Sequence, residues 1–137
     1  MIGAADFGFV AAFDATGREL WRQAPVVNIG GLAVTAEGIT LLACFSEGVC
    51  RLDQKGKSLP TLTLDEPCRL ISSSFSGDRH LCGGLTNQVI LLKEAGRVLA
   101  RQALSAAIVG LALGPLGQAF FTATADGRIT KYRIDNP

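Results

Sequence analysis

Short apolar runs, separated by turns that contain glycine, follow one another along the whole chain. The clearest unit has the turns Glu37-Gly38, Ser46-Glu47-Gly48 and Gln54-Lys55-Gly56, which separate four runs: residues 32–35, 39–45, 49–53 and 58–64. The runs are too short for typical helices, and the lengths of the turns fit hairpins rather than crossover connections. The pattern therefore predicts antiparallel β-strands throughout the chain.

This unit repeats along the sequence every 39 or 40 residues. Three series of matching positions share the spacing: Gly8, Gly48, Gln88 and Gly127; Gly17, Gly56 and Gly96; Gly38, Gly77 and Gly117. Four antiparallel strands in about 40 residues is the size of one β-propeller blade. We therefore predict a single all-β domain of about three and a half blade repeats, made of a partial blade at 1–28, full blades at 29–67 and 68–106, and a partial blade at 107–137.

The predicted strands number three, four, four and three in the successive units. Other runs are 2–6 in the first unit, 69–74, 81–85, 89–93 and 98–103 in the third, and 108–113, 118–124 and 128–134 in the last. The partial units at both ends leave strand edges and apolar faces that need cover. We expect a partial propeller that is completed by oligomerisation, with a homodimer of twice the 14.4 kDa chain mass. Capture in a larger propeller and a closed ring of four blades are the alternatives.

The segment Val10-Ala-Ala-Phe-Asp-Ala-Thr-Gly-Arg-Glu-Leu-Trp21 carries a recognisable pattern. It resembles the repeat of quinoprotein-type (PQQ-like) propellers, in which apolar and alanine positions lead to Asp, then Thr-Gly, then Trp four residues after the glycine. Pro60 and Ala100 hold the Trp position in the later units. The blade length also suits WD40-like propellers, although their Trp-Asp and Gly-His pairs are absent. The resemblance at superfamily level implies a propeller fold.

Composition narrows the classes of partner. Lys and Arg number 13 against 12 Asp and Glu, so the net charge of +1 gives no electrostatic reason to expect nucleic acid or an anionic membrane. No apolar run approaches the roughly 18 residues that a membrane helix needs, so no membrane insertion is expected. The N-terminus has no basic region typical of a secretory signal. We expect a cytoplasmic protein.

Four cysteines and one histidine are the candidate metal ligands. Cys44, Cys50, Cys68 and Cys82 show no Cys-x-x-Cys spacing, and only His80 is available to complete a metal site. We interpret the cysteines as small core residues in a reducing compartment, with zinc or a redox pair as the alternative. His80 follows the turn at 76–79 and is predicted to lie on the surface.

Three further residues are interpreted as structural. Trp21 is predicted to wedge between adjacent blades, with ligand stacking as the alternative. Asp14 and Asp53 precede glycine turns and are expected to cap their own hairpins by accepting backbone N–H groups. Calcium binding is the alternative for these carboxylates, but the spacing of a calcium loop is absent.

No catalytic constellation is apparent, and we expect neither an enzyme nor a cofactor. Quinone-dependent dehydrogenases, in the family that the chain resembles, use more blades, a calcium site and often a pair of adjacent cysteines. Ser72, Ser73 and Ser74 lack the Gly-x-Ser-x-Gly elbow of a nucleophile. The glycine pairs Gly30-Gly31 and Gly83-Gly84 are followed by strands instead of a phosphate-binding helix.

We therefore predict a non-catalytic propeller module that acts as a scaffold for protein interaction or assembly. Its partner would be another protein or further copies of the chain that complete the propeller. The predicted partner-binding residues are in turns that the topology brings to one rim: Phe7, Asn28, Glu47, Asp65, Glu66, Asn87 and Asp126. The alternative is a small-molecule-binding or quinoprotein-like sensor with its ligand in the central channel. The first strands of the blades, which would line that channel, are mostly small and apolar.

Overall fold

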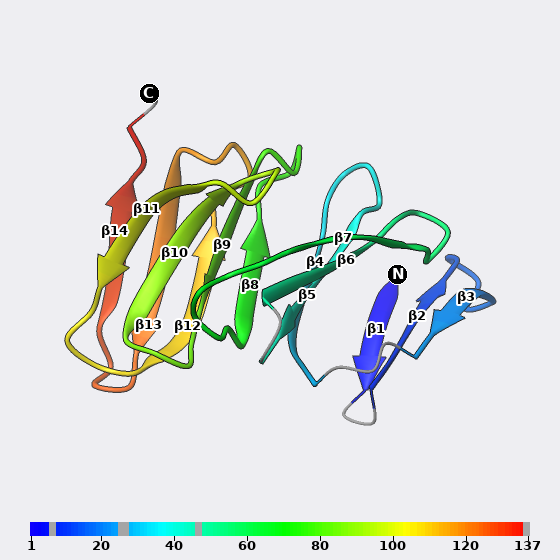
Figure 1. Cartoon of the computed structure of the whole chain (residues 1–137), viewed down its shortest axis with the longest axis horizontal. Helices are drawn as coiled ribbons and strands as arrows, with labels where there is room; N and C mark the ends of the chain where they lie inside the picture. Colours follow the sequence, from blue (N-terminus) through cyan, green and yellow to red (C-terminus); the bar gives the residue numbers. More distant parts are fainter. Residues whose placement is uncertain (6–7, 25–27, 46–47, 136–137) are drawn as a thin grey trace.

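The computed structural model describes residues 1–5, 8–24, 28–45 and 48–135, and these residues form fourteen β-strands and no helix (Figure 1). The strands are β1 (Ile2–Ala5), β2 (Phe9–Phe13), β3 (Glu19–Gln23), β4 (Ile29–Val34), β5 (Thr40–Cys44), β6 (Gly48–Leu52), β7 (Ser58–Leu62), β8 (Leu70–Ser73), β9 (Arg79–Gly83), β10 (Gln88–Lys93), β11 (Val98–Ala103), β12 (Ile108–Leu113), β13 (Ala119–Thr124) and β14 (Ile129–Arg133). The prediction of an all-β chain is confirmed.

The strands form four antiparallel sheets in chain order. Sheet 1 is β1-β2-β3, sheet 2 is β4-β5-β6-β7, sheet 3 is β8-β9-β10-β11 and sheet 4 is β12-β13-β14. Within each sheet, every strand pairs with the next strand of the chain, as hairpin turns require. The grouping of three, four, four and three strands agrees with the glycine repeat of the sequence. Over the described residues, the sheets do not close into a ring.

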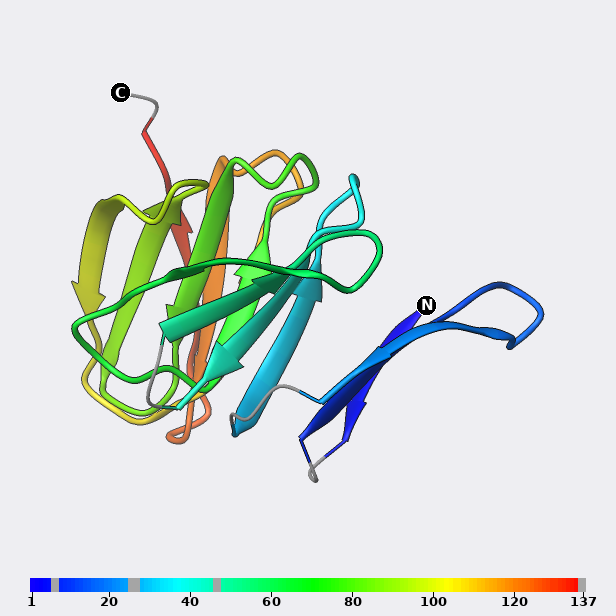
Figure 2. The ribbon, with the colours of Figure 1, turned by 45° about the vertical axis from the view of Figure 1, so that its right-hand side comes forward.

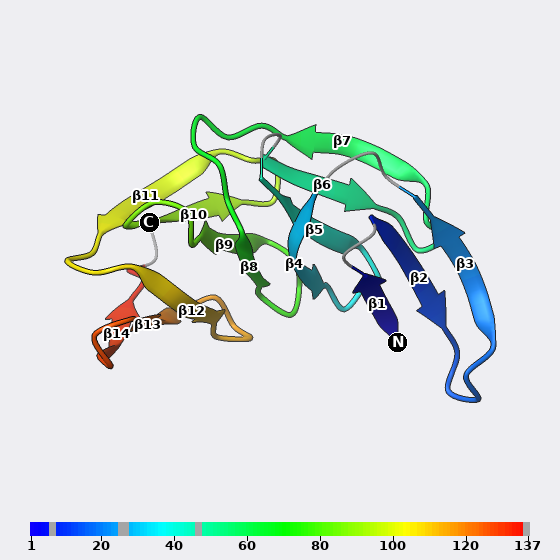
Figure 3. The same cartoon turned by 90° about the horizontal axis from the view of Figure 1, so that it is seen from below.

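The sheets stand side by side along an arc, as seen in Figure 3. The strands at the inner edge of the arc are neighbours across the sheets, because β1 contacts β4, β4 contacts β8 and β8 contacts β12. The strands β3, β7 and β11 lie on the outside. Sheet 1 is at one end, and its β2–β3 hairpin projects beyond the rest of the chain (Figure 2).

Each sheet packs one face against the next sheet, so the core consists of three apolar layers. Val10 of sheet 1 packs with Leu42, Cys44 and Leu52 of sheet 2. The second layer joins Leu41, Ala43 and Val49 of sheet 2 to Ile71, Cys82 and Ile90 of sheet 3. The third layer joins Leu81, Val89 and Leu91 of sheet 3 to Ile108, Leu113 and Phe120 of sheet 4. Both faces of sheets 2 and 3 are therefore covered, which explains why their central strands are apolar at successive positions.

The predicted turn and wedge roles are confirmed. Asp14 accepts the backbone N–H groups of Thr16 and Arg18, and Asp53 accepts those of Lys55 and Lys57. These bonds lower the pKa of both carboxyl groups. The Trp21 ring lies against the β6–β7 turn of sheet 2, so Trp21 does separate two neighbouring sheets.

The predicted surface position of His80 is wrong. His80 lies inside β9, opposite Ser73 and Leu92, and only 2% of it is exposed. Strand β9 begins at Arg79, immediately after the turn, so the histidine side chain faces sheet 2 instead of water. Burial, together with the positive charge of Arg51, lowers the pKa of His80.

Candidate functional site

The predicted rim is the lower edge of the molecule in Figure 1, where every second connection between strands lies. Phe7 and Glu47 fall outside the described residues. The other predicted residues belong to four connections along this edge: Asn28 between β3 and β4, Asp65 and Glu66 between β7 and β8, Asn87 between β9 and β10, and Asp126 between β13 and β14. Their role in binding a partner stays a prediction.

The acidic pair at the centre of this rim is engaged within the chain. The Arg101 guanidinium on β11 contacts both carboxylate oxygens of Asp65, at 2.7 and 2.9 Å, and one oxygen of Glu66 at 3.6 Å. The hydroxyl of Thr86 donates to Glu66 at 2.9 Å. The bonds from Arg101 lower the pKa of Asp65. The sequence alone does not indicate this partner, because Arg101 lies one repeat further along the chain, in another sheet.

Two further rim residues, Asp126 and Asn87, also form bonds within the chain. Asp126 accepts bonds from the Thr124 hydroxyl and from the backbone N–H of Arg128. The carbonyl of Asn87 accepts the N–H of Leu104 at 2.7 Å. The carboxylates of Asp65, Glu66 and Asp126 are therefore engaged within the chain. The outward faces of the two end sheets, in contrast, are not covered by another sheet of the described residues.

The outward face of sheet 4 is apolar at its centre. Residues directly opposite each other in a ladder share a face, and two such rows are Ala112–Phe121–Lys131 and Gly110–Ala123–Ile129. Phe121 is 39% exposed and Ile129 is 76% exposed. The Lys131 ammonium lies 5.7 Å from the centre of the Phe121 ring.

These rows match two rows of sheet 2 that are covered. Ala33–Leu41–Arg51 and Gly31–Ala43–Val49 occur 79 or 80 residues earlier, which is two repeats. Leu41 and Val49 are fully buried because sheet 3 packs on them. The same ladder positions are thus interior in sheet 2 and exposed in sheet 4.

The outward face of sheet 1 corresponds to the other face of sheet 2. Gly3, Ala11 and Arg22 form one row, and Phe13 lies opposite Glu19. Arg22 is paired with Glu19 at 2.7 Å, and its guanidinium lies 4.5 Å from the centre of the Phe9 ring. These positions correspond to the face of sheet 2 that sheet 1 itself covers.

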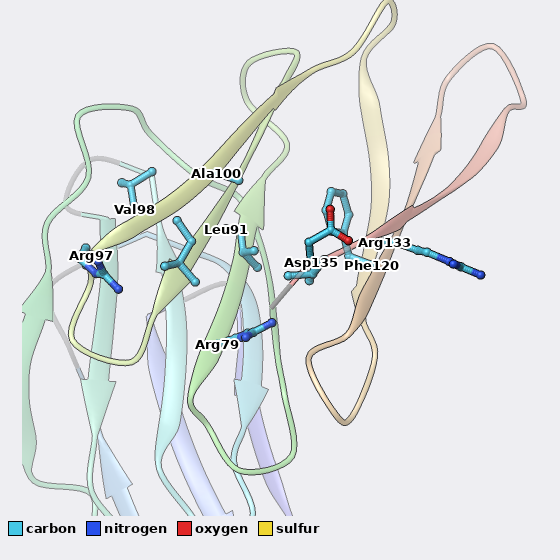
Figure 4. Close-up of a pocket in the computed structure, with 10 residues that line it drawn as sticks. Arg79, Leu91, Arg97, Val98, Ala100, Phe120, Arg133 and Asp135 are labelled. Carbon is cyan, nitrogen blue, oxygen red and sulfur yellow. The ribbon is translucent and has the colours of Figure 1, made fainter. Parts of the chain in front are cut away.

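A pocket of about 500 Å³ lies between sheets 3 and 4 (Figure 4). Its apolar lining comes from both sheets: Leu91, Val98, Leu99, Ala100, Phe120 and Ile134. Its charged lining residues are Arg79, Arg97, Arg133 and Asp135. In Figure 4, the side chain of Arg133 extends away from the pocket. The guanidinium of Arg79 donates to the carbonyl of Gly117 at 2.7 Å.

One serine and the histidine make a contact that the sequence did not indicate. The Ser73 hydroxyl is 3.1 Å from Nδ1 of His80, because the two residues are paired across β8 and β9. In nucleophilic catalysis, a histidine within hydrogen-bond distance of a serine acts as the base that activates the serine hydroxyl. The adjoining cavity of about 50 Å³ is lined by His80 but not by Ser73, and the Ser73 hydroxyl also bonds the carbonyls of Ser74 and Arg79. We therefore interpret the pair as a contact between β8 and β9.

The cysteines are free thiols in the core, as predicted. The Sγ atoms of Cys44 and Cys50 are 2.9 Å apart on adjacent strands, and the thiol of Cys68 donates to the carbonyl of Gly48. Burial raises the pKa of Cys44 to about 12. In the part of the chain that the structure describes, no three His, Cys, Asp or Glu side chains gather as metal ligands.

No protein-family model matches the chain, and a comparison with curated proteins finds no relative. The resemblance to quinoprotein-type or WD40-like propellers therefore stays a prediction from the sequence. Among the described residues, there is no helix of the length and hydropathy needed to cross a bilayer.

Proposed function

We propose that the chain is a non-catalytic assembly module whose four sheets stack as propeller blades and whose end faces bind a second copy. The outward face of sheet 4 carries this proposal. Ile129 and Phe121 hold ladder positions that are fully buried in sheet 2, as Val49 and Leu41. A contiguous apolar face in water is typical of a protein interface. The free core thiols support a reducing compartment such as the cytoplasm.

The occupant that fits the outward face of sheet 4 is the outward face of sheet 1 from a second copy. At all three junctions inside the chain, the face of one sheet that points towards the C-terminal sheets packs on the face of the next sheet that points towards the N-terminal sheets. The outward face of sheet 4 is of the first kind, and the outward face of sheet 1 is of the second kind. Within the described residues, neither of these two end faces packs on another sheet. Gly3 and Ala11 hold the positions of Leu42 and Cys50, which pack towards sheet 1.

Geometry supports the same arrangement. A head-to-tail contact uses two different surfaces, so repetition of the contact either closes a ring or builds a filament. Two copies of four sheets would supply the blades of a propeller of ordinary size. We therefore propose a closed dimer.

Light scattering of the full chain tests this function. We expect a particle of twice 14.4 kDa for the natural sequence and a 14.4 kDa particle for Ile129→Asp. The matched control is Leu116→Asp, because Leu116 is equally exposed, at 76%, but lies in the β12–β13 turn. This control is expected to remain dimeric.

Three results would overturn the proposal. One is a stable 14.4 kDa particle for the natural sequence. Another is a dimer that persists in Ile129→Asp. The third is a monomer that binds a different protein through the same face, which would replace the second copy as the partner. Particles that grow with concentration would support the contact but contradict the closed dimer.

A further inference from the structure

Equivalent positions between neighbouring sheets occur at each of the three junctions, but different side chains fill the space there. At the junction of sheets 1 and 2, the Trp21 ring fills it. The indole N–H donates to the carbonyl of Gln54 at 2.9 Å. A Cβ added to Gly56 would lie 2.6 Å from the ring, which shows how closely the ring approaches that turn. The chain plugs this junction with its own aromatic side chain.

At the junction of sheets 2 and 3, a different side chain fills the site. The Nε of Arg51 donates to the carbonyl of Pro60 at 2.8 Å, and Pro60 holds the Trp21 position in this repeat. The space that remains is about 50 Å³, and its lining includes Ile39, Arg51, Leu59, His80 and Glu94. This junction is nearly closed.

At the junction of sheets 3 and 4, the site is open. The lining residues Arg79, Leu91, Leu99, Phe120 and Ile134 each lie 40 residues after a lining residue of the previous junction, and the volume rises to about 500 Å³. Leu91 holds the position that Arg51 holds in the previous repeat. Ala100, opposite Leu91, stands where Trp21 stood opposite Ala12. Both plugs are replaced by shorter side chains, so the larger volume has an explanation in the sequence.

The open site is apolar inside, and the charged residues at its edge are three arginines, Arg79, Arg97 and Arg133, and one carboxylate, Asp135. Leu91 and Phe120 are buried parts of the third core layer. Figure 4 places Arg97 near Val98 and Arg79 below Leu91, with the Arg79 guanidinium directed towards Phe120 and Asp135. Among the ion pairs of the described residues, none involves Arg97. An apolar cavity with a few convergent charged groups is the usual form of a small-molecule site.

We propose that this pocket binds a small aromatic carboxylate. The aromatic ring takes the place that the indole of Trp21 occupies at the first junction, against Leu91, Leu99 and Phe120. The carboxylate faces Arg97, because guanidinium groups bind carboxylates with charge-assisted hydrogen bonds. The Arg79 guanidinium also lines the pocket, but it already donates to the Gly117 carbonyl and lies 3.9 Å from the Asp78 carboxylate. The site lies within one chain, so it is independent of the proposed association between copies.

Calorimetric titration of the full chain with 2-naphthoate tests the proposal. We expect saturable binding of one ligand per chain. The neutral analogue 2-naphthalenemethanol is expected to bind at least tenfold more weakly, and Arg97→Gln to weaken the affinity for 2-naphthoate about tenfold, since each loses one charged partner. Ala100→Trp restores the missing plug and should abolish binding.

Two controls keep the result interpretable. Arg133→Gln removes the same charge from a side chain that extends away from the pocket, so its affinity should equal that of the natural sequence. Amide chemical shifts of Leu99 and Ala100 should move on titration and report the location directly. Ile129→Asp should bind 2-naphthoate normally, which separates this proposal from the assembly.

The proposal is overturned by any of four results: no saturable binding of 2-naphthoate, equal affinity for the neutral analogue, unchanged affinity in Arg97→Gln, or unchanged affinity in a folded Ala100→Trp. A loss in Arg133→Gln as large as that in Arg97→Gln would also contradict it, because the ligand would then sit on the outward face of sheet 4.

Discussion

The indole N–H of Trp21 on β3 donates to the carbonyl of Gln54 in the next sheet, at 2.9 Å. This bond crosses the junction of sheets 1 and 2, and the ring covers the β6–β7 turn that contains Gln54. Trp21 is the single tryptophan of the chain. Its fluorescence therefore reports the integrity of this junction alone.

Removal of the Trp21 ring should destabilise the chain. We expect Trp21→Ala to lower the free energy of unfolding by about 2–4 kcal/mol, below the range for a fully buried tryptophan because the ring is half-buried. Trp21→Phe keeps part of the apolar contact and loses the bond to Gln54, so about 1 kcal/mol is expected. Urea denaturation followed by circular dichroism measures both values. Equal stability of Trp21→Ala and the natural sequence would contradict the wedge role.

Gly56→Ala should cost more than Gly17→Ala, although both glycines occupy equivalent turns with φ values of +78° and +86°. An added Cβ at Gly17 meets nothing within 4 Å, so only the backbone cost of about 1 kcal/mol is expected. At Gly56 the added Cβ also meets the Trp21 ring. In a double-mutant cycle, the excess cost at Gly56 should disappear in the Trp21→Ala background. An excess that persists there would show that Trp21 is not its cause.

The stability of the fold should fall below pH 6.5 because of His80. Burial and Arg51 lower the pKa of His80 in the folded chain, while the charges of Glu94 and Asp78 oppose this more weakly. The unfolded chain therefore binds a proton more readily than the folded one as the pH falls through 6.5, the unperturbed pKa. The free energy of unfolding should decrease by up to about 1.4 kcal/mol per pH unit in this window.

The carboxyl groups act at lower pH and are separable from His80. The folded chain lowers the pKa of Asp14, Asp53 and Asp78, so these ionised carboxylates stabilise the fold at neutral pH. Their stabilisation is lost only as the pH falls through the unperturbed pKa of 3.8. The free energy of unfolding of His80→Gln, measured by denaturation at each pH, should consequently stay constant between pH 7 and pH 5. A slope equal to that of the natural sequence would assign the acid sensitivity to another group.

The core thiols should be inert in the folded chain. Cys44 has a pKa of about 12 and is fully buried, so no reactive thiolate forms at neutral pH. Cys68 and Cys82 are at most 1% exposed, so burial protects Cys68 although its bond with the Cys82 thiol lowers its pKa. The thiol reagent dithiobis(nitrobenzoate) at pH 8 should therefore modify Cys44, Cys68 and Cys82 only at the rate of unfolding. All four cysteines should react at once in concentrated urea. Rapid modification of a buried cysteine in the native chain would contradict the packing described.

The strand order could be predicted because glycines recur at the turns of every repeat. Each series of turn glycines, such as Gly17, Gly56 and Gly96, adopts a positive φ that other residues rarely adopt, so the turns keep their identity while the strands vary. The start of a strand is less visible. The sequence places His80 in the turn because the apolar run begins at Leu81, whereas backbone pairing already begins at Arg79.

The candidate sites depend on distances that the sequence does not carry. The pairing of Asp65 with Arg101 joins residues 36 positions apart in different sheets, so the rim was interpreted as acidic. The substitution of alanine for tryptophan at Ala100 was visible, but the resulting pocket was not. Its volume depends on Leu91 and Phe120 as well, and these three residues meet only when sheets 3 and 4 pack.

The head-to-tail contact between copies is tested most directly by the mass of two mixed variants. Gly3→Arg places a long side chain on the outward face of sheet 1, where an added Cβ meets nothing within the chain, and Ile129→Asp disrupts the outward face of sheet 4. Each variant alone should scatter as a 14.4 kDa particle. Their mixture retains one intact face of each kind, so light scattering should return particles of twice that mass. A mixture that stays at 14.4 kDa, or either variant that dimerises alone, would contradict the assembly.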